Sequence, residues 1–454
     1  MEIKNRNILV VGIATSGIPT VNTLLQLGAK ITINDIKEED QLKEVLEHIH
    51  TDQIQMILGH HPEKVSQYDF IVLSPGVPTD LPFLTEAREQ GVPVIGELEL
   101  AYQLCAGSFV AITGTNGKTT TTALTGEIFQ NACKETYVVG NIGVAAISKS
   151  LEAGKNAVMV TEVSSFQLES IVDFKPHIAA VLNITPDHLN RHKTMENYID
   201  AKSNIFRNQT AEDILVLNMD DEQAYKLKER ANSHTIFFSR KQTLEEGAFI
   251  ENGSIVVHKN GTKEHICKIE ELRIPGAHNL ENALAATVIA YWTGIDGKII
   301  EETLRTFMGV EHRIEFVDEV SGILFINDSK GTNPDASIKA VEAVREPIIL
   351  IAGGMDKGSS FESFIDAFQG KVKYMVLIGE TANKMKETAV YMGFENCCIV
   401  KDMEEAVKLA YSTAKSGDTV LLSPACASWD MYQSYEQRGN HFKECVGRLR
   451  RSIE

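Results

Sequence analysis

The chain lacks any long hydrophobic run. No apolar stretch approaches the ~20 residues that a helix needs to cross a bilayer. The apolar run near the N-terminus is interrupted by Gly12, Ser16 and Gly17, and no small-residue cleavage site follows it. We therefore expect a first strand rather than a signal peptide, and no membrane span.

Paired cysteines are missing as well. The chain has 7 cysteines, an odd number, and none are spaced as C-x-x-C. This pattern favours reduced thiols in a cytoplasmic protein over a disulfide framework. Cys426, in the segment SPACAS, is a nucleophile candidate without an evident base, so we interpret it as a small buried residue.

Positive charge is scarce relative to negative charge. Lys and Arg number 44 against 62 Asp and Glu, which gives a formal net charge of −18. Such a balance opposes nonspecific binding to polyanions, so no nucleic acid is expected as a partner. The chain also has no fixed-period repeat, low-complexity segment or Pro-rich linker.

Length and patterning predict an α/β protein of three domains. With 454 residues the chain exceeds a single core, and apolar runs alternate with helical segments throughout. We predict a Rossmann-like domain over 1–96, a central P-loop domain with a mostly parallel sheet over 97–309, and a second Rossmann-like domain over 310–454. In the central domain, Asn252-Gly253 predicts a hairpin turn and Asn279 is predicted to cap a long helix.

The segment FVAITGTNGKTTTT, from Phe109 to Thr122, predicts a phosphate loop. An apolar run of strand type leads into a glycine-bounded turn, and Lys118 opens a helix. Glycines let backbone N–H groups close on phosphate oxygens, Lys118 can reach the outer phosphates, and the Thr119 hydroxyl can bind Mg²⁺. Position 112 is Ile rather than Gly, so the match is to the shorter form G-x-x-G-K-T.

A second glycine pattern lies in the first domain. Gly12 and Gly17, with Asp35 at the end of the second strand, resemble a dinucleotide fingerprint whose middle glycine is replaced by Ala14. Because an alanine restricts the approach of a pyrophosphate, the pattern indicates that the first domain binds another nucleotide or a nucleotide sugar. The alternative is that these residues form a tight strand-to-helix turn that binds no ligand.

Polar residues follow several central strands. They are Asn141 in GNIG, Glu162 in TEVSSFQLE, Asp187-His188 in NITPDHLNRH, and Lys202 in YIDAKSNIF. Glu162 is placed to complete Mg²⁺ coordination opposite Thr119. Taken singly, Glu162 could be a solvated carboxylate, His188 a cap and Lys202 a surface lysine.

Seven motifs occur in order along the whole chain: GTNGKTT, EVSSFQLE, NITPDHLNRH, HNLENALAA, EHRIE, NDSKGTNPDA and SPACASWDMYQSYEQRGNHF. This set resembles the Mur ligases of bacterial cell-wall synthesis. The resemblance implies an ATP-dependent amide ligase in which a substrate carboxylate takes the γ-phosphate and an amine attacks the acyl phosphate. It further implies a UDP-sugar domain, an ATPase domain and an amino-acid domain. We predict that the protein is a cytoplasmic monomer.

The resemblance also assigns roles in the ATP site. It implies two Mg²⁺ ions and a carbamate on Lys202, formed from CO₂, because an ammonium could not bind a metal. The implied catalytic residues are Lys118, His188, Lys202 and Asn141, and the implied metal ligands are Thr119, Glu162, His188 and Lys202. The implied ATP contacts are Gly114, Thr115, Asn116, Gly117, Lys118, Thr119, Thr120, Asn279, Arg313 and Asp328.

For the other substrates the resemblance implies UDP-N-acetylmuramoyl-L-alanine and D-glutamate. In the family member that adds diaminopimelate, a DNPR tetrapeptide contributes an arginine to the amino-acid site. This chain lacks that tetrapeptide, which argues against diaminopimelate as the amine. The implied contacts to the UDP-sugar are Thr15, Ser16, Gly17, Asp35, Lys37, Gly76, Asn141, Ser164 and Gln167. The implied contacts in the amino-acid domain are Lys330, Thr332, Lys357, Ser428 and Tyr435, where Tyr435 stands at a position that is often Phe.

Other functions remain open at this point. A different Mur-type ligase or a folate polyglutamate ligase shares the phosphate loop and the carbamate site, although the first domain opposes the folate enzyme. A nicotinamide-dependent oxidoreductase built on Gly12 to Asp35 would have no use for Lys118. A noncatalytic ATP-binding switch would not need both a sugar-nucleotide domain and an amino-acid domain.

Overall fold

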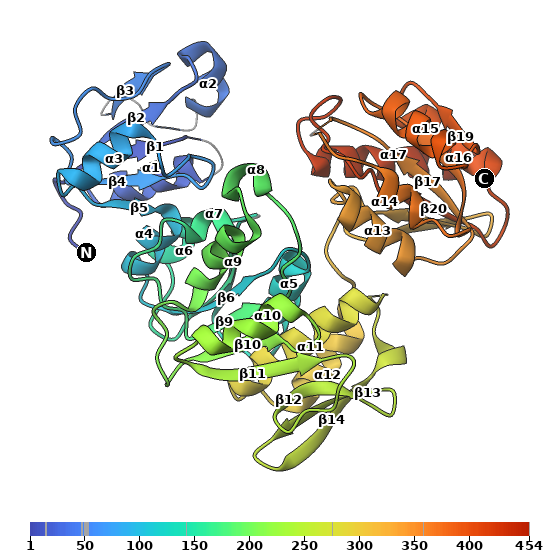
Figure 1. The fold of residues 1–454 in the computed structure, drawn as a ribbon, viewed down its shortest axis with the longest axis horizontal. Coiled ribbons are helices and arrows are strands. Elements are labelled where there is room, and N and C mark those ends of the chain that lie inside the picture. The colour runs from blue at the N-terminus through green and yellow to red at the C-terminus, as the bar shows by residue number, and fades with distance from the viewer. Residues whose placement is uncertain are drawn as a thin grey trace. The chain divides into compact units, whose positions relative to one another are not determined.

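The computed structural model describes residues 1–13, 16–46, 49, 54–141, 143–274, 276–356 and 358–453. The chain forms two compact units (Figure 1), one of Met1–Glu271 with Glu281–Arg305 and one of Leu272–Leu280 with Thr306–Glu454. Three sheets, largely parallel, confirm the predicted α/β class. Their strands fall within the three predicted domain ranges, whose boundaries remain a prediction.

The first sheet has five parallel strands in the order β3-β2-β1-β4-β5. Both of its faces are buried around β1, because Ile8 and Val10 join one hydrophobic cluster and Leu9 and Val11 join another. This explains the unbroken apolar runs in the sequence. The elements are β1 Asn7–Val11, α1 Gly17–Gln26, β2 Lys30–Asp35, α2 Glu39–Leu46, β3 Ile54–Leu58, β4 Phe70–Leu73, α3 Pro82–Glu89, β5 Val94–Gly96 and α4 Glu97–Leu104.

The central sheet has nine strands in the order β14-β13-β12-β11-β10-β9-β6-β8-β7. Its last three strands in sequence are antiparallel, and Asn252 and Gly253 form the predicted hairpin turn, both with positive φ. The strands are β6 Ser108–Thr113, β7 Thr136–Gly140, β8 Val158–Glu162, β9 Ile178–Val181, β10 Ile214–Asn218, β11 His234–Ser239, β12 Gly247–Glu251, β13 Ser254–Lys259 and β14 Thr262–Lys268. The α-helices are α5 Lys118–Asn131, α6 Ile147–Ser150, α7 Ser165–Leu168, α8 Leu189–His192, α9 Met195–Ser203, α10 Glu222–Lys226, α11 Ala277–Trp292 and α12 Gly297–Thr306.

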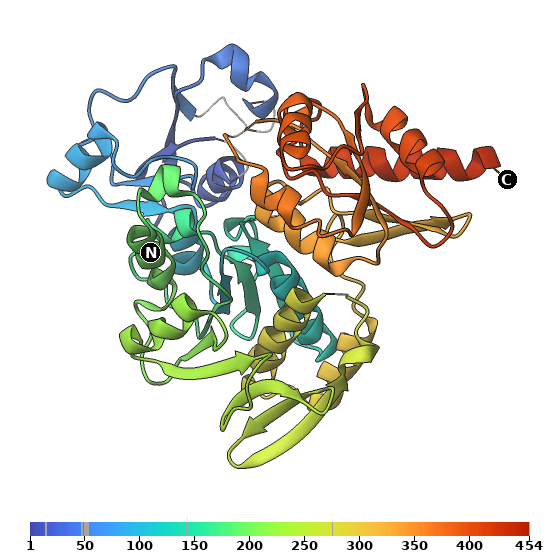
Figure 2. The same cartoon turned by 45° about the vertical axis from the view of Figure 1, so that its right-hand side comes forward.

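One prediction about α11 is wrong. The helix begins at Ala277, so Asn279 lies inside its first turn rather than at its cap. The backbone N–H of Asn279 donates to the carbonyl of Gly276, whose positive φ reverses the chain just before the helix. Further along, α11 lies beside α5 in both ribbon views (Figures 1 and 2), and Thr121 of α5 donates to Asn282 at 3.2 Å.

The sheet of the second unit has six strands in the order β15-β16-β20-β17-β18-β19. All neighbouring strands are parallel except β15 and β16. The elements are β15 Glu315–Val320, β16 Ile323–Asn327, α13 Pro334–Ala343, β17 Ile348–Ala352, α14 Glu362–Asp366, β18 Val372–Leu377, α15 Ala382–Tyr391, β19 Cys397–Ile399, α16 Met403–Thr413, β20 Thr419–Leu422 and α17 Tyr435–Ile453.

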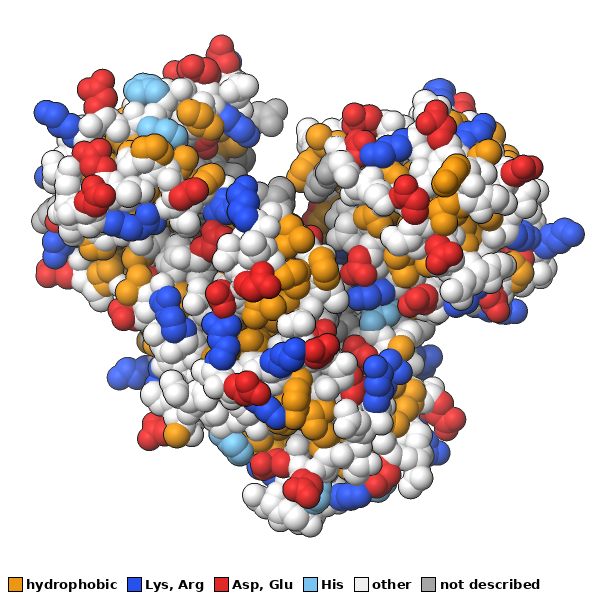
Figure 3. All heavy atoms as spheres, in the orientation of Figure 1, with side chains coloured by type: hydrophobic (Ala, Val, Ile, Leu, Met, Phe, Trp, Pro, Cys, Tyr) orange, Lys and Arg blue, Asp and Glu red, His pale blue; other side chains and the backbone are white. Residues whose placement is uncertain are grey.

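The surface carries both signs of charge. On the face drawn in Figure 3, Lys and Arg side chains are interspersed with Asp and Glu. Within the part of the chain that the structure describes, no helix is long and apolar enough to span a bilayer. All seven cysteines are free, and Cys426 is buried with the pKa of its thiol raised to about 11 by that burial. This fits the predicted structural role of Cys426.

Candidate active site

The phosphate loop joins β6 to α5, as the sequence predicts. Gly117 has φ +85°, and a Cβ there would lie 2.3 Å from Asn282 Oδ1, so glycine is required. The Thr115 N–H donates to the Asn183 carbonyl at 2.9 Å, and the Asn116 N–H to Asn183 Oδ1 at 2.8 Å. Asn183, two residues after β9, therefore fixes the backbone of the loop at two positions.

Two lysines meet at this loop. Lys118 Nζ donates to the carbonyls of Gly114 and Thr115 at 2.9 and 2.8 Å. Lys202, on α9, is only 1% exposed, and its Nζ donates to the same Gly114 carbonyl at 2.8 Å. Burial, and then the positive charge of Lys118, hold the pKa of Lys202 well below its ordinary value. A lowered pKa favours the neutral amine over the ammonium.

Glu162 ends β8 beside the phosphate loop. Parallel pairing of β6 and β8 sets Glu162 opposite Ile112, which puts its carboxylate at the loop's edge of the sheet. The side chain is 3% exposed, and Asn141 Nδ2 donates to its Oε1 at 3.2 Å. The backbones of Gly140 and Glu162 lie so close that a Cβ at position 140 would be 2.1 Å from the Glu162 carbonyl oxygen, so this position requires glycine. Asn141 and Glu162 are thus in direct contact, and Thr119 and Thr120 lie in the first turn of α5.

His188 precedes α8 in the left-handed conformation, with φ 52°. Its Nε2 lies 3.5 Å from Asp187 Oδ2, and its ring lies 4.9 Å from that of Phe166. Among the described residues, no three His, Cys, Asp or Glu side chains gather into a metal site.

The second histidine of NITPDHLNRH belongs to a cluster that sequence reasoning missed. His192 is buried, its Nε2 is 3.0 Å from Ser165 Oγ, and its Nδ1 is 3.4 Å from Glu169 Oε1. Burial lowers the pKa of its imidazole. The ring of Tyr198 lies 5.1 Å from that of His192 and 4.7 Å from Lys202 Nζ. The helical spacing of four residues from His188 was the only sequence signal.

The cluster also reaches the first sheet. Arg191 Nη2 donates to Glu169 Oε2 at 2.6 Å and to the Val77 carbonyl at 3.0 Å. Val77 follows Gly76, a predicted contact of the UDP-sugar. A single guanidinium thus connects α7, α8 and the segment that follows β4.

The glycine pattern of the first sheet makes a tight turn. A Cβ at Gly17 would lie 2.2 Å from the Gly12 carbonyl, so the strand-to-helix turn needs glycine there. Asp35 accepts from Ile13 N–H at 3.1 Å and from Lys37 N–H at 3.0 Å. Ser16 is half-buried, and Gly76 is exposed. Thr15 lies outside the described residues, as does Ala14.

In the second unit, Asp328 follows β16 and is buried. Burial raises the pKa of its carboxyl to about 7, although a hydrogen bond from Ser423 and the charge of Arg313 act in the opposite direction. Ser423 Oγ donates to Asp328 Oδ2 at 2.7 Å. Asn279 is buried in the same unit. The predicted ATP contacts Asn279, Arg313 and Asp328 therefore belong to one unit, and the phosphate loop belongs to the other.

The predicted amino-acid contacts lie on three segments of the second unit. Lys330 Nζ lies 5.7 Å from the ring of Tyr435, and Thr332 N–H donates to the Lys330 carbonyl. Ser428 is buried. Lys357 lies outside the described residues, but the segment before it bridges to the strand-end loop through Met355 and Ala427.

Arg438 joins two of these segments and was missed from sequence. It is 1% exposed and donates to the Ser329 carbonyl and hydroxyl at 2.7 and 3.0 Å, and to the carbonyls of Cys426 and Ala427 at 3.1 and 3.2 Å. Burial lowers the pKa of this guanidinium to about 10, which leaves it charged. Arg438 lies in the motif SPACASWDMYQSYEQRGNHF, but the sequence does not show that its side chain is buried.

Comparison with known proteins places these features in one family. The sequence matches the Mur ligase MurD-like N-terminal domain over 6–96, the Mur ligase middle domain over 112–290, and the Mur ligase, glutamate ligase domain over 312–426. A protein of Alkaliphilus oremlandii (strain OhILAs), named UDP-N-acetylmuramoylalanine--D-glutamate ligase, is 57% identical over 99% of this chain and 100% of its own length. A protein of the same name from Clostridioides difficile (strain 630) is 51% identical, again over 99% of this chain and 100% of its own length.

Solved structures agree at the level of the fold. The UDP-N-acetylmuramate-alanine ligase MurC of Thermotoga maritima superimposes with a TM-score of 0.62 at 21% identity, covering 99% of this chain and 100% of that one. The MurF ligase of Thermotoga maritima, in complex with ADP, gives a TM-score of 0.59 at 16% identity over 99% of this chain and 96% of that one. With close relatives matched over their full length and all three family domains found in order, the chain belongs to the Mur ligase family.

Proposed function

We propose that this protein is an ATP-dependent ligase that adds D-glutamate to UDP-N-acetylmuramoyl-L-alanine in the synthesis of peptidoglycan precursors. The observation that carries the proposal is full-length identity of 57% and 51% to relatives that bear that activity in their names. The proposal is supported by a loop of phosphate-binding sequence at which Lys118 and Lys202 donate to one carbonyl.

The proposed reaction begins with the carboxylate of the L-alanyl group. It attacks the γ-phosphorus of ATP, ADP leaves, and an acyl phosphate forms. The amine of D-glutamate then adds to the acyl carbon, and the tetrahedral intermediate expels phosphate to give the amide. The first step brings anions together, so Lys118 is proposed to turn from the loop carbonyls to the β- and γ-phosphates.

The donor set fits Mg²⁺. The Glu162 carboxylate and the Thr119 hydroxyl are oxygen donors at the edge of the sheet next to the loop, and Mg²⁺ takes few protein ligands besides phosphate and water. Two Mg²⁺ ions, when bound, would neutralise the triphosphate and the attacking carboxylate. We assign Thr119 and Glu162 to the first ion, and His188 with Lys202 to the second.

Lys202 fits a carbamate because its environment favours a neutral amine. The amine adds to CO₂, a proton is released, and the product is an anionic carbamate that could bind a cation. Conversion of the Lys202 ammonium to a carbamate would also remove the charge repulsion between Lys202 and Lys118. This repulsion contributes to the lowered pKa of Lys202. Asn141 is proposed to hold the Glu162 carboxylate in place through its amide.

The remaining roles follow the three sheets. Residues 1–96 are proposed to bind the UDP-sugar, 97–309 to bind ATP, and 310–454 to bind D-glutamate, with Asn279, Arg313 and Asp328 contacting the nucleotide. The proposed substrate contacts are Thr15, Ser16, Gly17, Asp35, Lys37, Gly76, Ser164 and Gln167 for the UDP-sugar, and Lys330, Thr332, Lys357, Ser428 and Tyr435 for D-glutamate. We also propose that the protein is a cytoplasmic monomer. The free cysteines support the cytoplasm as its compartment.

An acceptor panel tests the function. ADP release is measured with UDP-N-acetylmuramoyl-L-alanine and, in turn, D-glutamate, L-glutamate, L-alanine, diaminopimelate and D-alanyl-D-alanine. We expect D-glutamate to give the highest kcat/KM by at least about a hundredfold. L-Alanine leaves the donors for a second carboxylate unpaired, and L-glutamate, with both carboxylates bound, cannot present its amine in the same direction. A faster rate with any other acceptor would refute the assignment.

A further inference from the structure

The loop that follows β20 contains an alanine in a strained backbone conformation. Ala425 has φ 57°, in the left-handed region, which L-residues other than glycine rarely adopt. Its side chain is 1% exposed and belongs to a hydrophobic cluster of the second unit. Such a conformation persists only where the surrounding structure imposes it, and it is frequent at functional sites. The partners of Ala425 therefore indicate which residue imposes the turn.

Ser337, on α13, holds this alanine by its backbone. The Ala425 N–H donates to Ser337 Oγ at 2.9 Å, and both residues are buried. On the other side of the Ala425 Cα, the Cys426 carbonyl accepts from Arg438 Nη1 at 3.1 Å. With the backbone fixed on both sides of this Cα, the φ of Ala425 is restricted to the left-handed value.

The same hydroxyl joins two segments that carry proposed D-glutamate contacts. Ser337 Oγ donates to the Gly331 carbonyl at 3.3 Å, directly before Thr332. On the other segment, Ala425 lies three residues before Ser428, which is buried. One side chain therefore connects the loop after β16 to the loop after β20.

Ser423 is a second buried serine in this network. Like Ser337 it is 0% exposed, and its Oγ lies 2.8 Å from Ser337 Oγ. Its hydroxyl donates to Asp328 Oδ2 at 2.7 Å, so it supports a proposed nucleotide contact. Removal of the Ser423 hydroxyl leaves the bond between Ser337 and Ala425 in place. Ser423 is thus a matched control for Ser337.

We infer that Ser337 is a positioning residue of the amino-acid site, which keeps Ala425 left-handed and thereby sets the position of Ser428. The inference rests on the proposed function for the identity of the ligand. Because Ser337 is fully buried, it acts through the loop and not on the substrate. Without its hydroxyl, position 425 relaxes toward the negative φ that alanine prefers, and Ser428 is displaced.

The first experiment compares Ser337→Ala with Ser423→Ala in ADP release. We expect Ser337→Ala to raise KM for D-glutamate about tenfold, with KM for UDP-N-acetylmuramoyl-L-alanine within about twofold of wild type. Ser423→Ala removes a hydroxyl of equal size and burial, and it should leave KM for D-glutamate within about twofold of wild type. An unchanged KM for D-glutamate in Ser337→Ala, or an equal rise in both variants, would overturn the inference.

The second experiment restores the turn without restoring the hydroxyl. Glycine adopts positive φ about as readily as negative φ, so Ala425→Gly removes the preference that Ser337 opposes. Ala425→Gly alone should keep the wild-type KM for D-glutamate. Added to Ser337→Ala, it should recover most of the lost affinity, whereas a purely structural role for Ser337 predicts no recovery. Absence of recovery in the double variant would count against the inference.

A spectrum recorded without substrates tests the conformation itself. In protein labelled with carbon-13 at the Cα of alanine, the Ala425 signal is identified by its absence from Ala425→Gly. We expect this signal to move in Ser337→Ala and to stay near its wild-type position in Ser423→Ala. If Ser337→Ala does not fold, Ser337→Cys replaces it, because a thiol is only a weak acceptor and should give a smaller shift and a smaller rise in KM. A signal that does not move in the Ser337 variant would refute the inference.

The outcome is separable from that of the proposed function, because the spectrum needs neither ATP nor D-glutamate. If another acceptor proves to be the substrate, a moved signal with a raised KM for that acceptor supports the inference while the function falls. If wild type uses D-glutamate, and Ser337→Ala changes neither the signal nor the KM, the inference falls and the function stands.

Discussion

At the scale of single residues, the pair of lysines at Gly114 gives the clearest chemical test. Lys202 is buried, and Lys118 donates to the same carbonyl. Burial and the positive charge of Lys118 both disfavour the protonated form of Lys202 and lower its pKa. We expect Lys202→Ala and Lys202→Arg each to lower kcat by about a hundredfold or more, since neither side chain can carry a carbamate. Removal of bicarbonate at mildly acidic pH should lower wild-type turnover reversibly.

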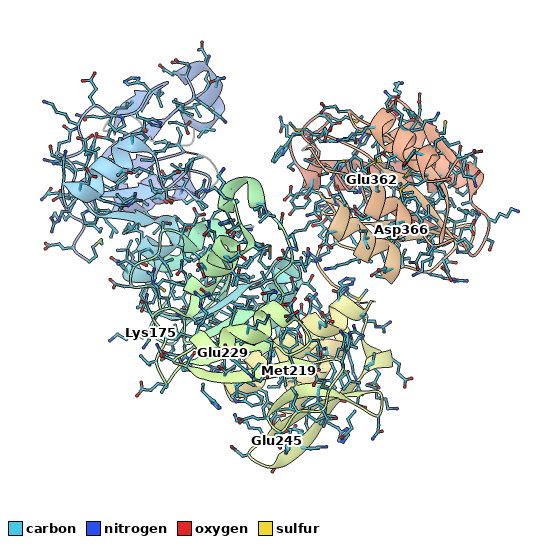
Figure 4. The ribbon with its side chains drawn as sticks, in the orientation of Figure 1. Lys175, Met219, Glu229, Glu245, Glu362 and Asp366 are labelled. Carbon is cyan, nitrogen blue, oxygen red and sulfur yellow. The ribbon has the colours of Figure 1, made fainter. Side chains whose placement is uncertain are left out.

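The control for the Lys202 variants is a lysine that forms a salt bridge outside the proposed site. Lys175, labelled in Figure 4, lies 3.2 Å from Asp213. Lys175→Arg keeps that charge and should leave kcat near the wild-type value. A Lys202→Arg enzyme of normal rate, unaffected by bicarbonate, would show that a simple cation suffices at position 202.

At the scale of elements, the residue before α15 connects two segments that lead to proposed amino-acid contacts. Thr381, before α15, accepts from the Gly354 N–H at 3.1 Å through its hydroxyl and lies 3.3 Å from Cys426 Sγ. Its own N–H donates to the Gly354 carbonyl at 2.9 Å. Thr381 thus fixes the segment that leads toward position 357 against the loop after β20.

Thr381→Val keeps the shape of this side chain but removes the acceptor. The buried Gly354 N–H then loses its partner, at a cost of about 1–3 kcal/mol. We expect a lower Tm and a KM for D-glutamate raised about fivefold or more, with KM for the UDP-sugar unchanged and with Thr381→Ser close to wild type. Thr388→Val on the same helix, where the hydroxyl only donates to the Lys384 carbonyl, is the control. Equal KM values in the two valine variants would contradict the prediction.

Elements with a strong local pattern were predictable, and those shaped by packing were not. The apolar run before the glycine-bounded loop predicts β6, and the residues after the loop predict α5. Asn252-Gly253 predicts the hairpin turn between β12 and β13. Four of the missed strands, β3, β14, β15 and β19, lie at an edge of a sheet, where a strand need not be apolar on both faces. The fifth, β11, was missed although it is an interior strand with buried Ile236 and Phe238.

The same distinction holds for the site. Lys118, Glu162 and Lys202 follow from motifs and strand ends, and the structure brings Lys118 and Lys202 to one carbonyl. Arg438 could not be predicted, because its partner Ser329 lies 109 positions away and the burial of its side chain is not visible in the sequence. Sequence alone therefore identified residues within motifs better than residues whose role depends on packing.

At the scale of the whole molecule, the two compact units carry separate hydrophobic clusters. One cluster spans the first and central sheets within the first unit, and two others lie in the second unit. The chain has 2 tryptophans, Trp292 in the first unit and Trp429 in the second. In a Trp292→Phe background, fluorescence therefore reports unfolding of the second unit alone.

Asp328 should make the stability of the second unit fall as pH rises. Burial raises the pKa of its carboxyl from 3.8 to about 7 in the folded state, so the folded form binds the proton more tightly than the unfolded form. The stabilisation from protonation is fully present below the unfolded pKa and is lost as pH rises through the folded value. Between about pH 5 and pH 8 the loss should reach about 3 kcal/mol.

Urea unfolding of wild type and Asp328→Asn across this pH range measures that loss. The amide cannot titrate, so the free energy of unfolding of the variant should rise relative to wild type as pH increases. Contributions from the half-buried His278 and the buried His312 cancel in the difference. Asp402, at the start of α16, is the control, because a backbone hydrogen bond from Glu405 lowers the pKa of its carboxyl. Its stabilisation is lost only in more acidic solution, so Asp402→Asn should shift the whole curve without changing its slope. Parallel curves for wild type and Asp328→Asn would show that Asp328 is already ionised in the folded protein near pH 5.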